Sequence, residues 1–104
     1  EAGAVTTEEE IEGYFIIKSV LRPFVDPKRI VHRDALSYFA ILLDNNNRKT
    51  ICRLYLGSKK YLVVLDDNKK EIKHEISSLD EIYDYVDLLK GVVERLEKAL
   101  VTKG

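Results

Sequence analysis

Residues 33–56, RDALSYFAILLDNNNRKTICRLYL, predict two β-strands joined by a polar turn, and this stretch decides the fold. The turn spans residues 44–49, where three consecutive asparagines separate two apolar runs. Asparagine and aspartate tolerate left-handed backbone angles and accept hydrogen bonds from their own backbone, so such a cluster marks a chain reversal. We therefore expect an antiparallel hairpin at the centre of the molecule.

The register of this hairpin sorts its side chains onto two faces, because successive strand residues point to opposite sides of a sheet. The apolar face is predicted to hold the pairs Leu43–Thr50, Ile41–Cys52, Phe39–Leu54 and Ser37–Leu56. The opposite face is predicted to hold the pairs Ala40–Arg53 and Tyr38–Tyr55. One face is therefore dry, and the other carries tyrosine and arginine.

The same register, carried into the following strands, predicts how much apolar surface each face holds. It sorts four further residues: Leu62 and Val64 onto the face of Tyr55, and Val63 and Ile72 onto that of Leu54. The Tyr55 face would then be unusually apolar for a solvated sheet. We expect either one helix on each side of the sheet or a partner on this face.

The N-terminal segment predicts a helix. Thr7 and Glu10 have the spacing of a capping box, apolar residues then recur at helical intervals, and Pro23 ends the pattern. Gly13 costs about 1 kcal/mol relative to alanine inside a helix, which predicts a close neighbour from the sheet or the second helix.

The remaining elements complete the fold class. Further strands are predicted at residues 28–33, 60–65 and 71–76, and Ser78 with Glu81 forms a second capping box that opens a longer helix. We predict an α+β fold: an antiparallel meander sheet of four to five strands, flanked by an N-terminal and a longer C-terminal helix.

Length and composition bound the class of protein. The 104 residues are enough for one core, so residues 7–104 are predicted to form a single α+β module and residues 1–6 a linker remnant. The chain begins without Met or a signal-peptide pattern, as expected for a piece of a longer protein. Its 45% hydrophobic and 34% charged residues exclude disorder. No apolar run approaches the roughly twenty residues that cross a bilayer, so no membrane partner is expected.

No residue pattern in this sequence indicates a catalytic site or a cofactor site. The single cysteine, Cys52, is predicted to be a core residue of a cytoplasmic protein, since one thiol forms neither an intrachain disulfide nor a thiolate metal site. His32 and His74 lack partners at metal-ligand spacing. Asp34 and Asp44 flank a strand as in metal-dependent nucleases, but the next strand lacks their acid-x-Lys pattern. We expect no catalytic residue, no metal and no cofactor.

Charge is unevenly distributed along the chain. Residues 1–21 hold one basic and five acidic residues, residues 22–76 hold twelve and seven, and residues 77–104 hold four and six. The predicted sheet is therefore basic and the helices acidic, which permits an anionic partner on the sheet.

The arginine- and tyrosine-bearing face is the candidate functional surface. Tyrosine rings beside arginine can stack on bases and contact phosphates of single-stranded nucleic acid. The predicted nucleic-acid-binding residues are Arg33, Tyr38, Arg48, Lys49, Arg53 and Tyr55. The competing interpretation is structural: cross-strand tyrosine pairs stabilise sheets without any ligand, and the basic turn is simply solvated.

The sequence also resembles a known bacterial family. Segments that carry the resemblance read TTEEEIEGYFIIK (residues 6–18), HRDALSYF (32–39), LLDNNNRK (42–49), ICRLY (51–55) and SLDEIY (78–83). They resemble the C-terminal module of type I restriction enzyme restriction-subunit-like proteins, in which a nuclease domain and an acidic linker come first. The resemblance implies a cytoplasmic protein of DNA restriction or defence, whose nuclease residues lie outside this module.

Two functional hypotheses result. The first is a non-catalytic accessory module of a restriction-type endonuclease that contributes DNA or other nucleic-acid contacts, with the rest of the parent nuclease chain as a partner. The alternative is a protein-interaction or homodimerisation module that uses the apolar sheet face or the C-terminal helix. Salt separates the two, because phosphate contacts weaken steeply with ionic strength and apolar association does not.

Overall fold

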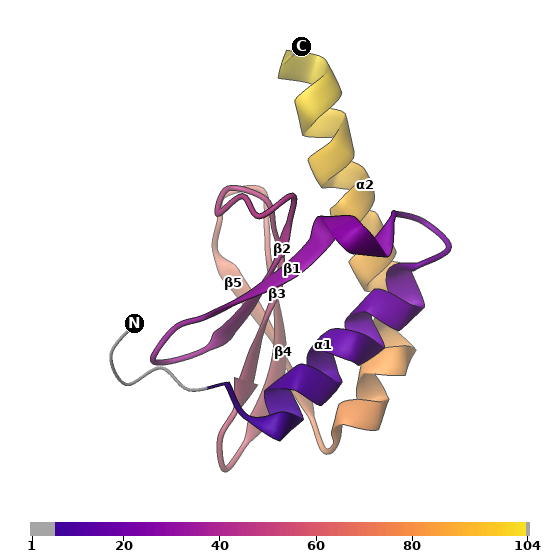
Figure 1. Cartoon of the computed structure of the whole chain (residues 1–104). Coiled ribbons are helices and arrows are strands. Elements are labelled where there is room, and N and C mark those ends of the chain that lie inside the picture. Colours follow the sequence, from indigo (N-terminus) through magenta and orange to yellow (C-terminus); the bar gives the residue numbers. More distant parts are fainter. Residues whose placement is uncertain (1–5, 104) are drawn as a thin grey trace.

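A computed structural model describes residues 6–103 of the chain, with side chains described over residues 6–98. The fold is α+β, as predicted, and its sheet has five antiparallel strands in the order β1-β2-β3-β4-β5 (Figure 1). The elements are α1 (Glu8–Leu21), η1 (Pro27–Arg29), β1 (Ile30–Asp34), β2 (Phe39–Leu43), β3 (Thr50–Leu56), β4 (Lys60–Leu65), β5 (Glu71–Ile76), η2 (Leu79–Tyr85) and α2 (Val86–Lys103).

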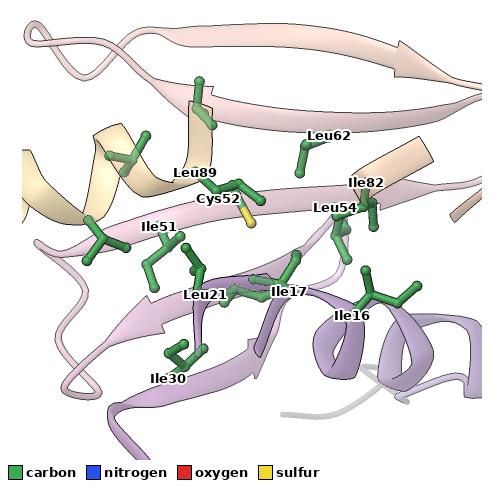
Figure 2. Packing of buried hydrophobic residues seen from close by; sticks show 14 of the residues in the cluster. Ile16, Ile17, Leu21, Ile30, Ile51, Cys52, Leu54, Leu62, Ile82 and Leu89 are labelled. Atoms are coloured by element: carbon green, nitrogen blue, oxygen red, sulfur yellow. The ribbon is translucent and has the colours of Figure 1, made fainter. Parts of the chain in front are cut away.

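Both long helices cover the same face of the sheet (Figure 1). The core lies between the two layers, where Ile17 of α1 and Leu89 of α2 pack with Leu54 of β3 (Figure 2). Cys52 belongs to this core, as expected, and burial raises the pKa of its thiol. The expectation of one helix on each side is therefore wrong, and the opposite face of the sheet has no helix over it within residues 6–103.

Helix α1 begins and packs as the sequence predicts. The Thr7 side chain accepts a hydrogen bond from the Glu10 backbone at 3.1 Å, and the Glu10 carboxylate accepts one from the Thr7 backbone at 3.0 Å. A Cβ added to Gly13 would lie 2.7 Å from Leu54 Cδ1 and 3.6 Å from Leu79 Cδ2. The glycine therefore lets α1 approach both β3 and η2 closely, which confirms the predicted close neighbour.

The central hairpin keeps the predicted faces from Phe39 to Ile41, but its register shifts at Thr50, which moves from the predicted apolar face to the open face. Phe39 pairs with Leu54, Ala40 with Arg53, and Ile41 with Cys52, as predicted. Thr50, however, pairs with Leu42, because a β-bulge shifts the register after Ile41. The extra residue buries Ile51 beside Cys52 on the helix side. The turn itself has left-handed angles at Asp44 (φ 59°) and Asn45 (φ 55°), in line with the asparagine signal.

The strand before the hairpin also differs from the prediction. Arg33 and Asp34 end β1, and residues 35–38 turn the chain into β2, with the Ala35 N–H donating to the Tyr38 carbonyl at 2.9 Å. Ser37 therefore lies in this turn and not opposite Leu56 in a strand.

The register of β4 contradicts the prediction. Leu62 pairs with Leu54 and faces the helices, whereas Val63 pairs with Arg53 on the opposite face. Val64 likewise lies in the core, and Tyr61 pairs with Tyr55. The cause is the loop after β3: Leu56 pairs with Lys60 across three loop residues, whereas the predicted faces correspond to a reversal over two residues, Gly57 and Ser58. One extra loop residue moves every side chain of the next strand to the other face.

The C-terminal helix begins later than the sequence predicts. Residues Leu79–Tyr85 form a 3₁₀ helix, and the α-helix starts at Val86. The Ser78 side chain makes no capping hydrogen bond; instead the Glu81 carboxylate accepts from the Ser77 backbone at 3.0 Å. Residues 1–5 of the predicted linker remnant lie outside the part of the chain that the structure describes.

Candidate nucleic-acid interface on the open sheet face

The sheet face without helices, called the open face here, is organised in rows that run across the strands. One row follows the cross-strand pairs from β1 to β5 and holds Arg33, Ala40, Arg53, Val63 and Lys73 in that order. Cations therefore alternate with small apolar residues. Because neighbouring strands lie about 4.8 Å apart, the backbone positions of successive cations are about 10 Å apart.

An aromatic row lies beside the cationic row. Tyr55 pairs with Tyr61, and the ring centroids of Tyr55 and Tyr38 are 5.7 Å apart. Residues two positions apart on a strand are separated by about 7 Å, so the two rows run side by side at that spacing. The open face thus holds a line of tyrosines next to a line of cations.

The two rows contact each other directly. The Arg53 guanidinium lies 4.6 Å from the centroid of the Tyr38 ring. Lys73 Nζ lies 5.4 Å from the Tyr55 ring and 5.5 Å from the Tyr61 ring. These cation–π contacts hold the positive groups close over the face instead of letting them extend into solvent.

This layer of side chains keeps small apolar residues dry. Ala40, Leu42 and Val63 are 8%, 2% and 0% exposed, although no helix of the described chain covers them. The cross-strand neighbours of Ala40 and Val63 are Arg33, Arg53 and Lys73, whose aliphatic stems cover them. Leu42 pairs with Val31 and Thr50 and lines the same pocket as Arg33 and Tyr38. The open face is therefore polar at its surface and apolar beneath. The predicted register, in contrast, implied an exposed apolar surface.

Glu71 of β5 neutralises part of this charge. Its Oε2 accepts a hydrogen bond from the Tyr55 hydroxyl at 2.6 Å and lies 2.8 Å from Arg53 Nη1. The Tyr55 and Arg53 donors lower the pKa of Glu71. Burial and the hydrogen bond to Glu71 raise the pKa of Tyr55 to about 12. Tyr55 therefore stays a neutral hydroxyl donor near neutral pH.

Arg33 occupies the other end of the cationic row. Its guanidinium donates to Asn45 Oδ1 at 2.7 Å and also to Asn47 Oδ1, both from the turn between β2 and β3. Amide oxygens orient the guanidinium without neutralising it. A pocket of about 310 Å³ lies beside this group, between Arg33, Tyr38 and Arg53.

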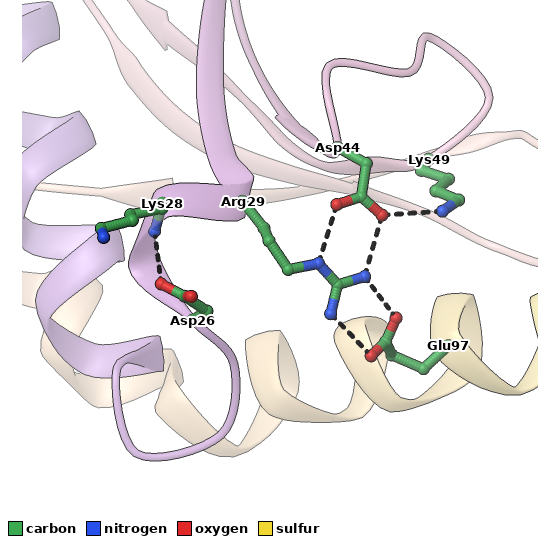
Figure 3. A network of polar contacts seen from close by, with 6 residues as sticks. All are labelled: Asp26, Lys28, Arg29, Asp44, Lys49 and Glu97. Carbon is green, nitrogen blue, oxygen red and sulfur yellow. Dashed lines mark hydrogen bonds and ion pairs between the residues drawn. The ribbon is translucent and has the colours of Figure 1, made fainter.

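The two other predicted residues lie away from these rows. Lys49 is 12% exposed, and its Nζ binds Asp44 Oδ2 at 2.9 Å. Asp44 also accepts from Arg29, which in turn binds Glu97 of α2 at 2.7 Å (Figure 3). Lys49 thus belongs to an ion-pair network that ties the turn to α2.

Arg48 is exposed at the turn, where its carbonyl accepts from Lys69 Nζ at 3.3 Å. The structure therefore brings together four of the six predicted residues: Arg33, Tyr38, Arg53 and Tyr55. Sequence reasoning did not include Tyr61 and Lys73 among the site residues. The sequence reasoning did place Lys73 on this face, and counting three residues in the loop after β3 would have placed Tyr61 there as well.

His32, Asp34 and Asp44 have structural partners. The His32 ring packs between those of Tyr14 and Phe39, at centroid distances of 4.7 and 5.0 Å. Asp34 accepts a hydrogen bond from the Thr6 hydroxyl, far from the ion pairs of Asp44. Within the described residues, no three His, Cys, Asp or Glu side chains cluster as metal ligands would.

Comparisons of this chain with protein-family models, with curated proteins and with solved structures each find no match. No helix within residues 6–103 combines the length and apolar character needed to span a membrane.

Proposed function

We propose that this chain is a non-catalytic accessory module that binds single-stranded nucleic acid across its open face. In this proposal it serves a restriction-type nuclease in the cytoplasm, the role that the sequence resemblance implies. The observation that carries the proposal is the cationic row beside the row of tyrosines.

The spacing of the two rows supports this ligand class. A nucleic-acid strand crossing the sheet perpendicular to the β-strands would lay its phosphates along Arg33, Arg53 and Lys73. Its bases would then lie over the tyrosines, about 7 Å away. Single strands offer unstacked bases to such a surface, whereas a duplex keeps its bases inside.

The ion pair between Arg53 and Glu71 limits the expected affinity. A phosphate that binds Arg53 competes with a carboxylate 2.8 Å away, so part of its binding energy is offset. Among the described residues, the hydrogen-bond partners of Arg33 are the neutral amides of Asn45 and Asn47, so Arg33 is the stronger phosphate contact. We expect weak, salt-sensitive binding, with a slope of log K against log salt of about −2 for three phosphate contacts.

The register of β4 weighs against the apolar alternative for this face. Leu62 and Val64, which would have made the face adhesive to an apolar partner, pack against the helices instead. Two of the remaining apolar residues, Ala40 and Val63, pair directly with Arg53 and are covered by it. An anionic ligand therefore suits this surface better than an apolar one.

Fluorescence anisotropy with labelled single-stranded DNA and RNA, titrated at low and moderate salt, tests the proposal. Arg33→Gln is expected to weaken binding about threefold to tenfold, and Tyr55→Leu at least about fivefold through lost stacking. Arg22→Gln is the matched control, because Arg22 caps the end of α1 on the helix layer and should leave binding unchanged.

Two outcomes would refute this function. One is the absence of oligonucleotide binding by the folded wild-type chain at low salt. The other is an equal loss of binding in the Arg22→Gln control, which would indicate attraction to net charge and not to the open face. Circular dichroism of each variant establishes that it is folded.

A further inference from the structure

Strand β5 (Glu71–Ile76) forms one edge of the sheet, and its outer side has no strand partner within the described chain. An edge strand presents backbone N–H and C=O groups that can pair with a further strand. Residues 71–73 and 75 of β5 are exposed, including Ile72 at 44%. From this edge we infer that the chain forms a symmetric dimer in which β5 pairs antiparallel with β5 of a second copy.

Symmetry restricts the registers that such a pairing can adopt. Two identical antiparallel strands side by side are related by a two-fold axis perpendicular to the sheet. The axis lies midway between one residue and the same residue of the second copy, so these two residues face each other. The rotation also keeps each side chain on its own face of the sheet. Only a few registers of a six-residue strand are therefore available, and each can be judged by the pairs it makes.

The register centred on His74 is self-complementary. Lys73 faces Glu75 of the second copy, and by symmetry the same pair forms again on the other side of the axis. Ile72 faces Ile76 across the junction on the helix side. This register joins five residues of each strand, with two opposite-charge pairs on the open face and two apolar pairs on the other.

The neighbouring registers are worse. Centring on Lys73 places two lysines face to face and opposes Glu71 to Glu75, and centring on Glu75 places two glutamates face to face. Centring on Ile72 overlaps only three residues of each strand. The alternation of charge along β5 thus selects one register for a second copy of the same strand.

Lysine on an edge strand often serves to prevent pairing, because an extended ammonium group repels an incoming strand. Here Lys73 Nζ lies over the Tyr55 and Tyr61 rings, which draws it back across the sheet and away from the edge. An incoming strand therefore meets no extended ammonium group at the edge, and the flexible Lys73 side chain turns from the rings to Glu75 of the second copy when the strands pair. Pairing in this way would join the open faces of the two copies into one continuous surface.

Charge reversal tests the pairing by sedimentation equilibrium of the full chain over a wide concentration range. Lys73→Glu and Glu75→Lys should each weaken dimerisation at least about tenfold, because each turns two attractive pairs into two repulsive ones. The double variant Lys73→Glu/Glu75→Lys should restore dimerisation to within about threefold of wild type. Lys70→Glu is the matched control, since Lys70 precedes the paired segment.

A chain that is monomeric up to about 100 μM, or a double variant as weak as the single ones, would overturn the inference. A cysteine test gives an independent measure of register. His74→Cys should form a disulfide-linked dimer under mild oxidation, because directly opposed residues have the Cα separation that a disulfide needs. Ile72→Cys should not, and efficient cross-linking at Ile72 would also overturn the proposed register. The native Cys52 is buried and stays outside this reaction.

Discussion

Apolar side chains of the central strands are buried on both faces of the sheet, but they are covered in different ways. On the helix side, Leu54 and Leu62 are buried under α1, η2 and α2. On the open side, Leu42 and Val63 are just as buried, although only side chains such as those of Arg33, Tyr38 and Arg53 lie beside them. Helices form a rigid, close-packed cover, whereas long side chains form a cover that can rearrange. The open face is therefore the part of the molecule that can exchange its cover for a ligand.

The largest expected effect contrasts one leucine from each face. Leu54→Ala should lower the free energy of unfolding by about 3–5 kcal/mol, because a close-packed site between helix and sheet cannot collapse around the cavity. Leu42→Ala should cost only about 2–3 kcal/mol, since the overlying side chains can settle into the space. Urea denaturation measures both. Equal losses would show that the open face is packed as rigidly as the core.

A pair of glycines distinguishes packed from free helix surface. Gly13→Ala should destabilise the chain by about 1 kcal/mol, because the new Cβ would lie 2.7 Å from Leu54 Cδ1 and the overlap outweighs the gain in helix propensity. Gly91→Ala should stabilise it by about 1 kcal/mol, because nothing lies within 4 Å of that position. Thermal melts reveal the sign, and a stabilising Gly13→Ala would contradict the described contact between α1 and β3.

The ion-pair network should make stability depend on acid. The Arg29 guanidinium and the Lys49 ammonium hold the pKa of Asp44 well below its usual range. The folded state therefore binds this proton less readily than the unfolded chain, so the stabilisation is present at neutral pH and is lost as the pH falls below about 4.

Asp44→Asn suits this test because asparagine tolerates the left-handed angle at this position. The stability difference between wild type and Asp44→Asn should be about 1 kcal/mol at pH 7 and should shrink towards pH 3. Urea denaturation at both pH values measures it. A difference that does not change with pH would contradict the assigned role of the Asp44 carboxylate.

The smallest expected effect concerns the open face alone. Glu71→Gln removes the carboxylate that favours a protonated Tyr55, so the pKa of Tyr55 should fall from about 12 towards its ordinary value near 10. The fall should be partial, because burial, the first cause of the raised pKa, remains. Ultraviolet titration measures it, and Glu75→Gln, on the same strand and face, should leave the pKa of Tyr55 unchanged.

Local signals in the sequence predicted much of the fold. The Thr7 capping box, the asparagine turn and the apolar periodicity each depend on residues a few positions apart, and the structure has α1 and the central hairpin where these signals lie. The periodic C-terminal segment is helical too, but it is a 3₁₀ helix over residues 79–85 before α2 begins. The inward orientation of Cys52 and the outward orientation of Arg53 also follow from strand alternation within one hairpin.

The candidate site was predicted only in part, because its composition depends on register between strands. One extra residue in the loop after β3 placed Tyr61 and Val63 on the open face and moved Leu62 and Val64 to the core. Lys49 lies away from the open face because it forms an ion pair with Asp44, which also binds Arg29 of another element. Such contacts between distant segments leave no pattern within a short window of sequence.

The sequence by itself determined the α+β class, the position of α1 and of the hairpin, and the orientation of Cys52 and Arg53, since these follow from propensity and from spacing along one segment. Only the tertiary structure decided that both helices share one side of the sheet and that Arg33, Arg53 and Lys73 stand in one row. These features depend on loop lengths and on packing between segments far apart in the chain. Strand pairing converts a difference of one loop residue into a change of face, and that change determines which side chains a ligand meets.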